Sequence, residues 1–339
     1  MIPPMNRRFL LVRRPLGIPV PDDFALVETA MPVLPPGGLI VRNHYASLDP
    51  AQRGWMDDAP SYMPPIPLGD AVRAATLGVV HASDNPAFAP GDWVRGAHAL
   101  EDYSAVPAGS FTRSIDIDAV DRPTLYLSAL GGNAMTAYFG LLDIAKPQPG
   151  ETLLVTGAAG GVGSIVGQIA KIVGCRTIGI AGGAEKCDRL LRDFGFDAAI
   201  DYKGKAVAEL AEEIRKVAPR GLDMLFENVG GTVMDAALLN LAQGARVVLC
   251  GLISEYNAPE RIGIRNLWQV LVQRATIHGM IVADYIPRFA EATDDIRRWL
   301  AEGKLHVEED VQDGLETAYP AFMRLFSGAN RGKQILRIA

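Results

Sequence analysis

The sequence predicts an α/β protein built from a doubly wound parallel sheet and a second, mostly β part. From about Gly150 onward, short apolar runs alternate with segments of helical periodicity, which is typical of a parallel α/β sheet. Before that point, proline and turn pairs surround short strand-like segments such as residues 37–47 and 91–96. A chain of 339 residues is also too long for one ordinary domain. We therefore expect two domains.

In the α/β part, the expected strands and helices follow one another in alternation. Strands are expected over residues 152–156, 177–181, 198–202, 222–229 and 245–251. Helices are expected over residues 162–173, 185–194, 206–217 and 232–241. A strand at 275–282 and a long helix at 286–302 complete six strands, which predicts a doubly wound sheet. A short helix near 315–326 and a final strand at 332–338 follow.

The charge balance and the cysteines restrict the class of protein. The formal net charge is -6, without long runs of either sign, which argues against a nucleic-acid-binding surface. The spacing of Cys175, Cys187 and Cys250 fits neither a disulfide framework nor a CxxC metal site, so we expect reducing, cytoplasmic surroundings. No apolar run approaches the roughly 18 residues of a membrane span, and no export signal is recognisable.

A glycine-rich turn lies between the first strand and the first helix of the α/β part. In VTGAAGGVGSIVGQIAK (residues 155–171), Gly157, Gly160 and Gly163 allow a tight turn, close approach of a pyrophosphate and packing of the helix on the strand. Free N–H groups at the helix start attract the anion. Gly161 and Val162 belong to the same predicted cofactor-binding turn. The alternative is a glycine turn that serves only the fold.

The end of the second strand bears on the choice of nucleotide. An NAD site ends this strand with Asp or Glu, which binds the ribose hydroxyls. Here the strand runs into Gly182 and Gly183, so no carboxylate is expected to repel a 2′-phosphate, and Lys186 follows to attract one. NADPH is therefore favoured over NADH. Glu185 is explained as a helix-start residue that complements the dipole, and Lys186 could alternatively be a solvated surface lysine.

Seven segments of this chain resemble one family. The chain looks like the zinc-independent medium-chain dehydrogenases/reductases of the leukotriene B4 dehydrogenase, prostaglandin reductase and curcumin reductase branch. The segments, in the family's order, are SLDPAQRG (47–54), MTAYFGLLDI (135–144), GAAGGVGSIVGQIAK (157–171), AGGAEKC (181–187), ENVGG (227–231), CGLISEYN (250–257) and GANRGK (328–333). The resemblance implies a GroES-like catalytic domain at 1–127, completed by about 309–339, and a Rossmann NADPH-binding domain at 128–308.

The resemblance also implies roles for individual residues. Lys186 and Tyr202 would contact the adenosine 2′-phosphate, Asn228 would lie near the nicotinamide ribose, and Asn330 would contact the cofactor from the C-terminal tail. The full set of expected cofactor-binding residues is Gly157, Gly160, Gly161, Val162, Gly163, Gly182, Lys186, Tyr202, Asn228, Cys250, Gly251, Tyr256 and Asn330.

Metal chemistry is not expected, although zinc alcohol dehydrogenases belong to the same superfamily. None of the five histidines stands in a Gly-His-Glu setting, and no cysteine cluster could hold a structural zinc. Without a Lewis acid, an α,β-unsaturated ketone or aldehyde is a suitable substrate, because hydride adds to Cβ and charge moves to oxygen. Tyr256 matches the family's tyrosine near the substrate carbonyl, and it is expected to stabilise the enolate together with a cofactor ribose hydroxyl.

The substrate pocket and the assembly are predicted with alternatives left open. Ala51 stands where many relatives have a tyrosine, and Trp55, Tyr62, Met135 and Tyr285 are further candidate pocket residues. Each of these could instead serve packing. An NADPH quinone reductase is the nearest alternative function, and a non-catalytic NADPH-binding protein is the alternative from another class. We also expect a homodimer, paired through the edge strand at 275–282.

Overall fold

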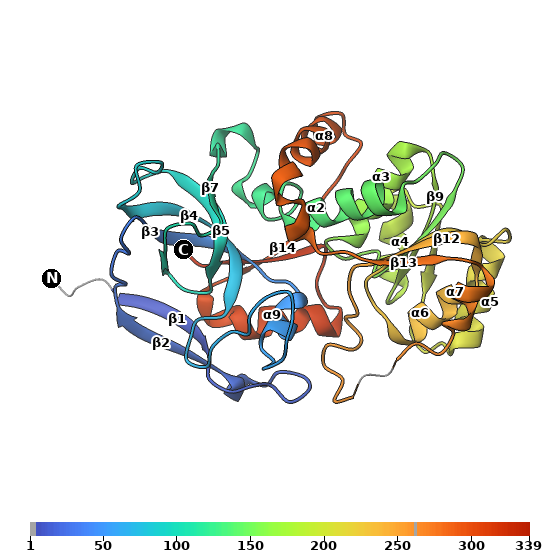
Figure 1. The fold of residues 1–339 in the computed structure, drawn as a ribbon, viewed down its shortest axis with the longest axis horizontal. Coiled ribbons are helices and arrows are strands. Elements are labelled where there is room, and N and C mark those ends of the chain that lie inside the picture. Colours follow the sequence, from blue (N-terminus) through green and yellow to red (C-terminus); the bar gives the residue numbers. More distant parts are fainter. Residues whose placement is uncertain (1–4, 261–262) are drawn as a thin grey trace. The chain divides into compact units, whose positions relative to one another are not determined.

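The structure is a computed structural model that describes residues 5–260 and 263–339. The chain divides into two compact units (Figure 1), one of Met1–Leu127 with Glu309–Ala339 and the other of Ser128–Glu308. The C-terminal segment therefore belongs to the same unit as the N-terminal part of the chain.

The unit of Ser128–Glu308 contains a six-stranded parallel sheet. Its strands are β8 (Thr152–Thr156), β9 (Arg176–Ala181), β10 (Ala198–Asp201), β11 (Leu222–Glu227), β12 (Leu241–Leu249) and β13 (Thr276–Gly279). They lie in the order β10-β9-β8-β11-β12-β13, and all neighbours pair in parallel. Counted along the chain this order is 3-2-1-4-5-6, that of a doubly wound Rossmann sheet. The predicted fold class is confirmed.

Helices cover both faces of this sheet. Figure 1 shows α2, α3 and α8 on one side and α5, α6 and α7 on the other. The helices of the unit are α2 (Gly132–Phe139), which continues as a π-helix (Gly140–Ala145), α3 (Gly163–Val173), α4 (Ala184–Arg192), α5 (Val207–Val217), α6 (Gly231–Leu238), α7 (Trp268–Val272) and α8 (Phe289–Ala301). Within residues 5–260 and 263–339, no helix is long and apolar enough to cross a bilayer.

The predicted helix at 286–302 is wrong at its start. Residues Val282–Arg288 form a 3-10 helix that contains Pro287, and α8 begins only at Phe289. Proline lacks the N–H that an α-helix interior needs, so the α-helical pattern starts after it. The predicted strand at 275–282 also ends earlier, at Gly279.

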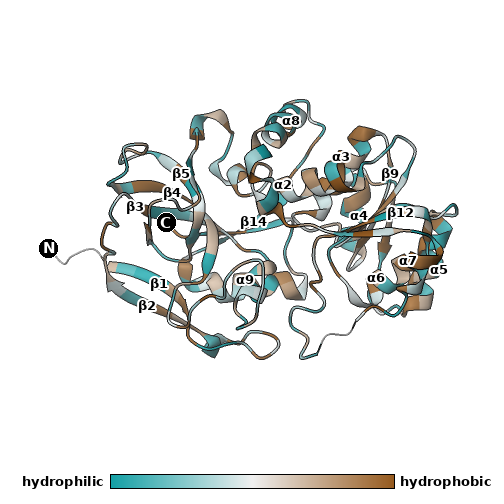
Figure 2. Ribbon diagram, in the orientation of Figure 1, coloured by the Kyte–Doolittle hydropathy of each residue, from teal (hydrophilic) through white to brown (hydrophobic). Residues whose placement is uncertain are grey.

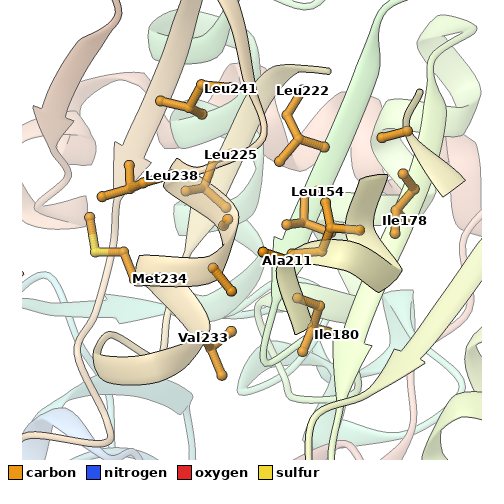
Figure 3. Close-up of a cluster of buried hydrophobic side chains, with 14 of the residues drawn as sticks. Leu154, Ile178, Ile180, Ala211, Leu222, Leu225, Val233, Met234, Leu238 and Leu241 are labelled. Atoms are coloured by element: carbon orange, nitrogen blue, oxygen red, sulfur yellow. The ribbon is translucent and has the colours of Figure 1, made fainter. Parts of the chain in front are cut away.

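The core of this unit lies between the sheet and the helices α5 and α6 (Figure 3). Leu154 and Leu225 come from the two central strands, and Ala211, Met234 and Leu238 come from the helices that cover them. Burying one such leucine contributes about 2 kcal/mol. The two central strands, β8 and β11, are therefore anchored in this core.

The other unit is mostly β. Its strands are β1 (Met5–Leu11), β2 (Phe24–Ala30), β3 (Leu39–Ser47), β4 (Arg73–Ser83), β5 (Trp93–Ala99), β6 (Tyr103–Val106), β7 (Thr112–Ser114), β14 (Glu309–Asp313) and β15 (Lys333–Arg337). Among the described residues of this unit, the α-helices are α1 (Ala51–Trp55) and α9 (Ala318–Ser327). A seven-stranded sheet has the order β14-β15-β3-β4-β5-β7, with β6 also paired to β3, and β1 and β2 form a separate ribbon.

The C-terminal segment supplies two strands to this sheet. The predicted final strand, β15, pairs antiparallel with β3. The strand beside it, β14, was not predicted, because its sequence EDVQD has a single apolar residue and no strand-like pattern. Its strand character comes from pairing with β15.

Candidate nucleotide site and the hollow beside it

The glycine turn between β8 and α3 leaves little room for side chains at its glycine positions. Gly157 has φ +60, a left-handed conformation that favours glycine. A Cβ at Gly163 would lie 2.5 Å from the carbonyl oxygen of Gly157 and 2.8 Å from the Cα of Ala158. A Cβ at Gly160 would lie 3.2 Å from the same carbonyl oxygen. The backbone therefore turns tightly enough for a bound pyrophosphate to approach it, as the cofactor prediction requires.

The helix that follows this turn starts without a capping side chain. Val162 is the N-cap residue of α3 and makes no side-chain cap, and Gly161 precedes it. The positive end of the helix dipole is thus available to an anion. The turn and the helix start fit the pyrophosphate of a dinucleotide.

The predicted residues for the 2′-phosphate gather at the ends of β9 and β10. A Cβ at Gly182 would lie 3.1 Å from the Cε1 atom of Tyr202 and 3.3 Å from its hydroxyl. Lys186 lies in the first turn of α4, which begins two residues after this glycine. Burial lowers the pKa of Lys186, and the positive charges of Arg189 and Lys203 lower it further. Gly182, Lys186 and Tyr202 therefore form one cationic corner.

The strand β9 ends at Ala181 without a carboxylate, as expected, but the neighbouring strand β10 brings one to this corner. Asp201 ends β10 and pairs with Ala181, the last residue of β9. Its Oδ1 atom accepts hydrogen bonds from the backbone N–H of Gly183 at 2.8 Å and of Lys203 at 3.0 Å. These bonds lower the pKa of Asp201. The sequence shows this aspartate in AAIDY, but only the parallel register brings it beside β9.

Asn228 lies at the ends of the central strands. Its backbone N–H donates to the hydroxyl of Thr156, and its Nδ2 donates to the carbonyl oxygen of Thr156, both at 2.8 Å. These two bonds place Asn228 beside the start of the glycine turn, as its predicted cofactor role requires.

Glu227 is a functional candidate that the sequence reasoning missed. Its side chain is fully buried, and Oε1 accepts hydrogen bonds from the Thr156 hydroxyl at 2.7 Å and the Gly230 N–H at 2.8 Å. Burial raises the pKa of Glu227, while these hydrogen bonds oppose the rise. The available signal was an acid that directly follows the apolar residues Met224, Leu225 and Phe226 at the end of a strand.

A hollow of about 320 Å³ opens beyond the carboxyl ends of β12 and β13. Ligands bind at this edge of doubly wound sheets. The lining residues are Leu249, Cys250, Gly251, Leu252, Tyr256, Gly279, Met280 and Ile281. The structure thus brings the predicted residues Cys250, Gly251 and Tyr256 together around one mostly apolar space.

Tyr256 is the hydroxyl-bearing residue of this hollow. Its oxygen accepts a hydrogen bond from the backbone N–H of Leu252 at 3.2 Å. A Cβ at Gly251 would lie 3.0 Å from that oxygen and 3.4 Å from the carbonyl oxygen of Asn228. The hydroxyl therefore lies above the chain segment that follows β12, close to Asn228, and can act as a hydrogen-bond donor to a ligand there.

Cys250 contributes packing and a neutral thiol to the hollow. Burial raises the pKa of its thiol to about 12, and the nearby charge of Glu227 adds to the effect. A thiol of this pKa remains protonated at neutral pH and is a poor nucleophile. All three cysteines of the chain are free.

The predicted pocket residues fall in both units. In the mostly β unit, Ala51 begins α1, and Trp55 donates from Nε1 to the hydroxyl of Tyr62 at 3.1 Å. The two rings meet edge to face at 6.4 Å, and Tyr62 is 53% exposed. In the α/β unit, Tyr285 stacks on Phe139 at 4.7 Å, whereas Met135 is fully buried.

Asn330 lies in the C-terminal tail and is buried in the mostly β unit. Its Nδ2 donates to the carbonyl oxygen of Gly332 at 2.9 Å. This bond orders the GANRGK turn, and its contact with the cofactor stays a prediction. Within the part of the chain that the structure describes, no group of three or more His, Cys, Asp or Glu residues could hold a metal ion.

Two family profiles match this chain. The one described as an N-terminal domain of oxidoreductase matches residues 7–114, and the one described as a zinc-binding dehydrogenase matches residues 161–298. The second profile is named for zinc, although the described residues offer no ligand cluster for it.

Individual relatives match over nearly the whole chain. The NADPH-dependent curcumin reductase of Escherichia coli (strain K12) is 41% identical, over 98% of this chain and 97% of its own. The 2-alkenal reductase (NADP(+)-dependent) of Nicotiana tabacum is 34% identical, over 98% of each chain. The crystal structure of CurA from Vibrio vulnificus in complex with NADPH is 41% identical, with a TM-score of 0.92 over 98% of this chain and 99% of that one.

Proposed function

The chain belongs to the zinc-independent branch of the medium-chain dehydrogenases/reductases, and from this premise we propose that it is an NADPH-dependent reductase of the C=C bond in α,β-unsaturated ketones or aldehydes. The observation that carries the proposal is the Tyr256 hydroxyl in an apolar hollow at the carboxyl edge of the sheet. Curcumin and 2-alkenal reductase relatives, similar over nearly their full length, support the same substrate class.

The unit of residues 128–308 binds the cofactor in this proposal, and the unit of 1–127 with 309–339 is a GroES-like catalytic domain. Bound NADPH supplies a hydride to Cβ of the substrate. The turn from Gly157 to Gly163 fits the pyrophosphate, because a Cβ at Gly163 would collide with the backbone. The remaining cofactor contacts are assigned to Gly182, Lys186, Tyr202, Asn228, Cys250, Gly251, Tyr256 and Asn330.

Tyr256 is the proposed catalytic residue. As negative charge develops on the substrate carbonyl oxygen, the Tyr256 hydroxyl donates a hydrogen bond to it. The N–H of Leu252 donates to the tyrosine oxygen, which orients the hydroxyl and polarises its O–H bond. A substrate that fills the hollow would place this hydrogen bond among apolar walls, where it is stronger than in water.

Substrate contacts are proposed for Ala51, Trp55 and Tyr62 in one unit and for Met135 and Tyr285 in the other. The exposed Tyr62 ring, held against Trp55, offers an aromatic surface to a flat, conjugated substrate. Ala51 leaves more room than the tyrosine of many relatives.

A homodimer formed through β13 is also part of the proposal. β13 is at the edge of the six-stranded sheet, with β12 as its neighbour. The adjacent helix α7, which can be followed in Figure 2, exposes 67% of Trp268 and 65% of Leu271. Pairing of two β13 strands across a two-fold axis would cover this edge. Light scattering at micromolar concentration should give twice the chain mass, and a monomer would exclude the dimer.

We place the enzyme in the cytoplasm, where its three free cysteines stay reduced.

The experiment that tests the function is NADPH consumption with a simple aliphatic enone, with the product identified by mass and NMR. A saturated ketone, formed faster with NADPH than with NADH, is expected. If the enone survives, the same assay with quinones decides between the alternatives. Turnover of a quinone alone would move the enzyme to the quinone reductases, and NADPH binding without any turnover would make it a binding protein.

A further inference from the structure

Two lysines at the cationic corner are not paired with acids. Within residues 5–260 and 263–339, neither Lys186 nor Lys203 takes part in an ion pair. Two other lysines of the same unit each form an ion pair. Lys171 pairs with Asp197 at 2.7 Å, and Lys205 pairs with Glu213 at 2.6 Å.

The two unpaired lysines approach the same glycine. Gly182 and Gly183 lie between the last residue of β9 and α4, whose first turn carries Lys186. A Cβ at Gly182 would lie 3.1 Å from the Cε atom of Lys203, and one at Gly183 would lie 4.0 Å from its Nζ. The charge of Lys203 also lowers the pKa of Lys186, which places the two ammonium groups in one electrostatic neighbourhood. Two like charges without partners are stabilised when an anion binds between them.

The third cation nearby, Arg189, is already engaged. Its guanidinium is buried, forms an ion pair with Glu308 and lies over the ring of Phe194 at 5.9 Å. Lys186 and Lys203 therefore remain as the cations for a ligand at this corner.

Asp201 holds the two lysine-bearing segments together. One oxygen, Oδ1, accepts the N–H of Gly183, just before α4, and the N–H of Lys203, just after β10. Because both bonds end on one atom, the position of Lys203 relative to Lys186 depends on this carboxylate.

We propose that Lys203 is a second phosphate-binding lysine for the 2′-phosphate of NADPH, and that Asp201 is the positioning residue that holds it opposite Lys186. The proposal rests on the NADPH-dependent function and adds two residues to it. Lys203 binds the phosphate directly, whereas Asp201 acts only through the two backbone N–H groups.

Calorimetric binding of two cofactor fragments tests the proposal without turnover. Adenosine 2′,5′-bisphosphate and 5′-AMP differ only in the 2′-phosphate, so the ratio of their affinities measures that phosphate alone. The wild-type enzyme should bind the bisphosphate at least about tenfold more tightly. Lys203→Ala should reduce this ratio by about tenfold and leave 5′-AMP binding unchanged, whereas Lys203→Arg, which keeps the charge, should preserve most of it.

The matched control is Lys205→Ala. It removes the same charge two residues further along, but from a lysine that is tied to Glu213. Its affinity ratio should stay within about twofold of wild type. If Lys203→Ala and Lys205→Ala lower the affinity ratio equally, the decrease reflects only the change in net charge. That result would overturn the assignment of Lys203.

Asp201 is tested by a pair of variants. Asp201→Asn keeps an oxygen acceptor for both N–H groups and removes a negative charge near the phosphate, so its affinity ratio should equal or exceed that of wild type. Asp201→Ala removes the acceptor, and its ratio should fall below that of Asp201→Asn. If the alanine variant binds the bisphosphate as well as the asparagine variant, Asp201 has no positioning role.

The outcomes distinguish NADPH specificity from the role of Lys203. A wild-type enzyme that binds both fragments equally would contradict NADPH specificity itself. A wild-type enzyme that discriminates while Lys203→Ala retains the full ratio would contradict only the inference about Lys203. Thermal melting of each variant identifies loss of folding, and in that case Lys203→Gln, which is shorter by one carbon and neutral, replaces the alanine variant.

Discussion

The Oε1 atom of buried Glu227 accepts a hydrogen bond from the hydroxyl of Thr156 at 2.7 Å, which joins the carboxyl end of β11 to that of β8. The same atom accepts the backbone N–H groups of Val229 and Gly230, and the Thr156 oxygen in turn accepts the N–H of Asn228. One side chain thus orders the chain where the glycine turn and the proposed ribose contact begin.

Removing this carboxyl should destabilise the protein. Glu227→Ala leaves three donors without their acceptor, and each unsatisfied buried group costs about 1–3 kcal/mol, so we expect a loss of about 3 kcal/mol after partial relaxation. Glu227→Gln keeps an oxygen acceptor and should lose less than about 1 kcal/mol. Urea unfolding measures both. An alanine variant as stable as the glutamine variant would show that the network contributes nothing.

Loss of the Tyr256 hydroxyl should reduce the rate and spare cofactor binding. A single lost donor to a developing oxyanion costs about two to three orders of magnitude. We therefore expect kcat/KM of Tyr256→Phe for the enone to fall by that amount, with a nearly unchanged Kd for NADPH. Tyr319→Phe is the control, because its hydroxyl donates to the carbonyl oxygen of Pro19. An unchanged kcat/KM in Tyr256→Phe would remove this residue from the mechanism.

The position of that hydroxyl can be tested with a single methyl group. A Cβ at Gly251 would lie 3.0 Å from the Tyr256 oxygen, so Gly251→Ala must displace the hydroxyl. Gly279→Ala is the matched control, since Gly279 lines the same hollow and a Cβ there would meet nothing within 4 Å. We expect kcat/KM to fall at least about tenfold in Gly251→Ala, which is 1.4 kcal/mol of transition-state stabilisation, and to stay within about twofold in the control. Equal activity of the two variants would mean that the Tyr256 hydroxyl does not act from the position seen in the structure.

Lys186→Ala should change the discrimination between the two nicotinamide cofactors. The lost ammonium group interacts with the 2′-phosphate, which NADH lacks. The apparent KM for NADPH should rise about tenfold and that for NADH should stay nearly constant, as measured by initial rates with the same enone. Equal shifts for both cofactors would show that Lys186 does not recognise the phosphate.

The mostly β unit should lose stability in mild acid. His98 is buried between the hydroxyls of Thr76 and Thr112, and burial lowers its pKa from 6.5 to about 4. Between these two values the unfolded chain binds a proton that the folded chain does not, so the stability contributed by neutral His98 is complete above pH 6.5 and declines as the pH falls towards 4. Between pH 7 and pH 5 the loss is about 2 kcal/mol.

Urea titrations at the two pH values measure this loss. His98→Gln cannot take up the proton, so its stability should change less than that of wild type by about that amount. The control is His81→Gln, on β4 of the same unit, which should retain the wild-type dependence. If the His98 variant loses as much stability as wild type between pH 7 and pH 5, the loss comes from carboxyl groups and not from His98.

Much of the fold follows from local patterns in the sequence. The glycine turn, the order of the α/β elements and the six strands were predictable because each depends on residues close together in the chain. The edge strand β14 was not, because its sequence is polar and it becomes a strand only through its partner β15. The start of α8 was predicted too early, because the apolar periodicity extends across Pro287. The proline ends this pattern locally, and the α-helix begins only after it.

The family, the nucleotide turn and the residue types at the site follow from short motifs, since these depend on composition and local spacing. Which of these residues contact one another depends on how the strands pair. Asp201 reaches Gly183 and Lys203 only through the parallel register of β9 and β10. Glu227 reaches Thr156 across 71 residues of sequence because β8 and β11 are neighbours. Parallel pairing is a non-local interaction, so the contacts that place these side chains are absent from any short stretch of the chain.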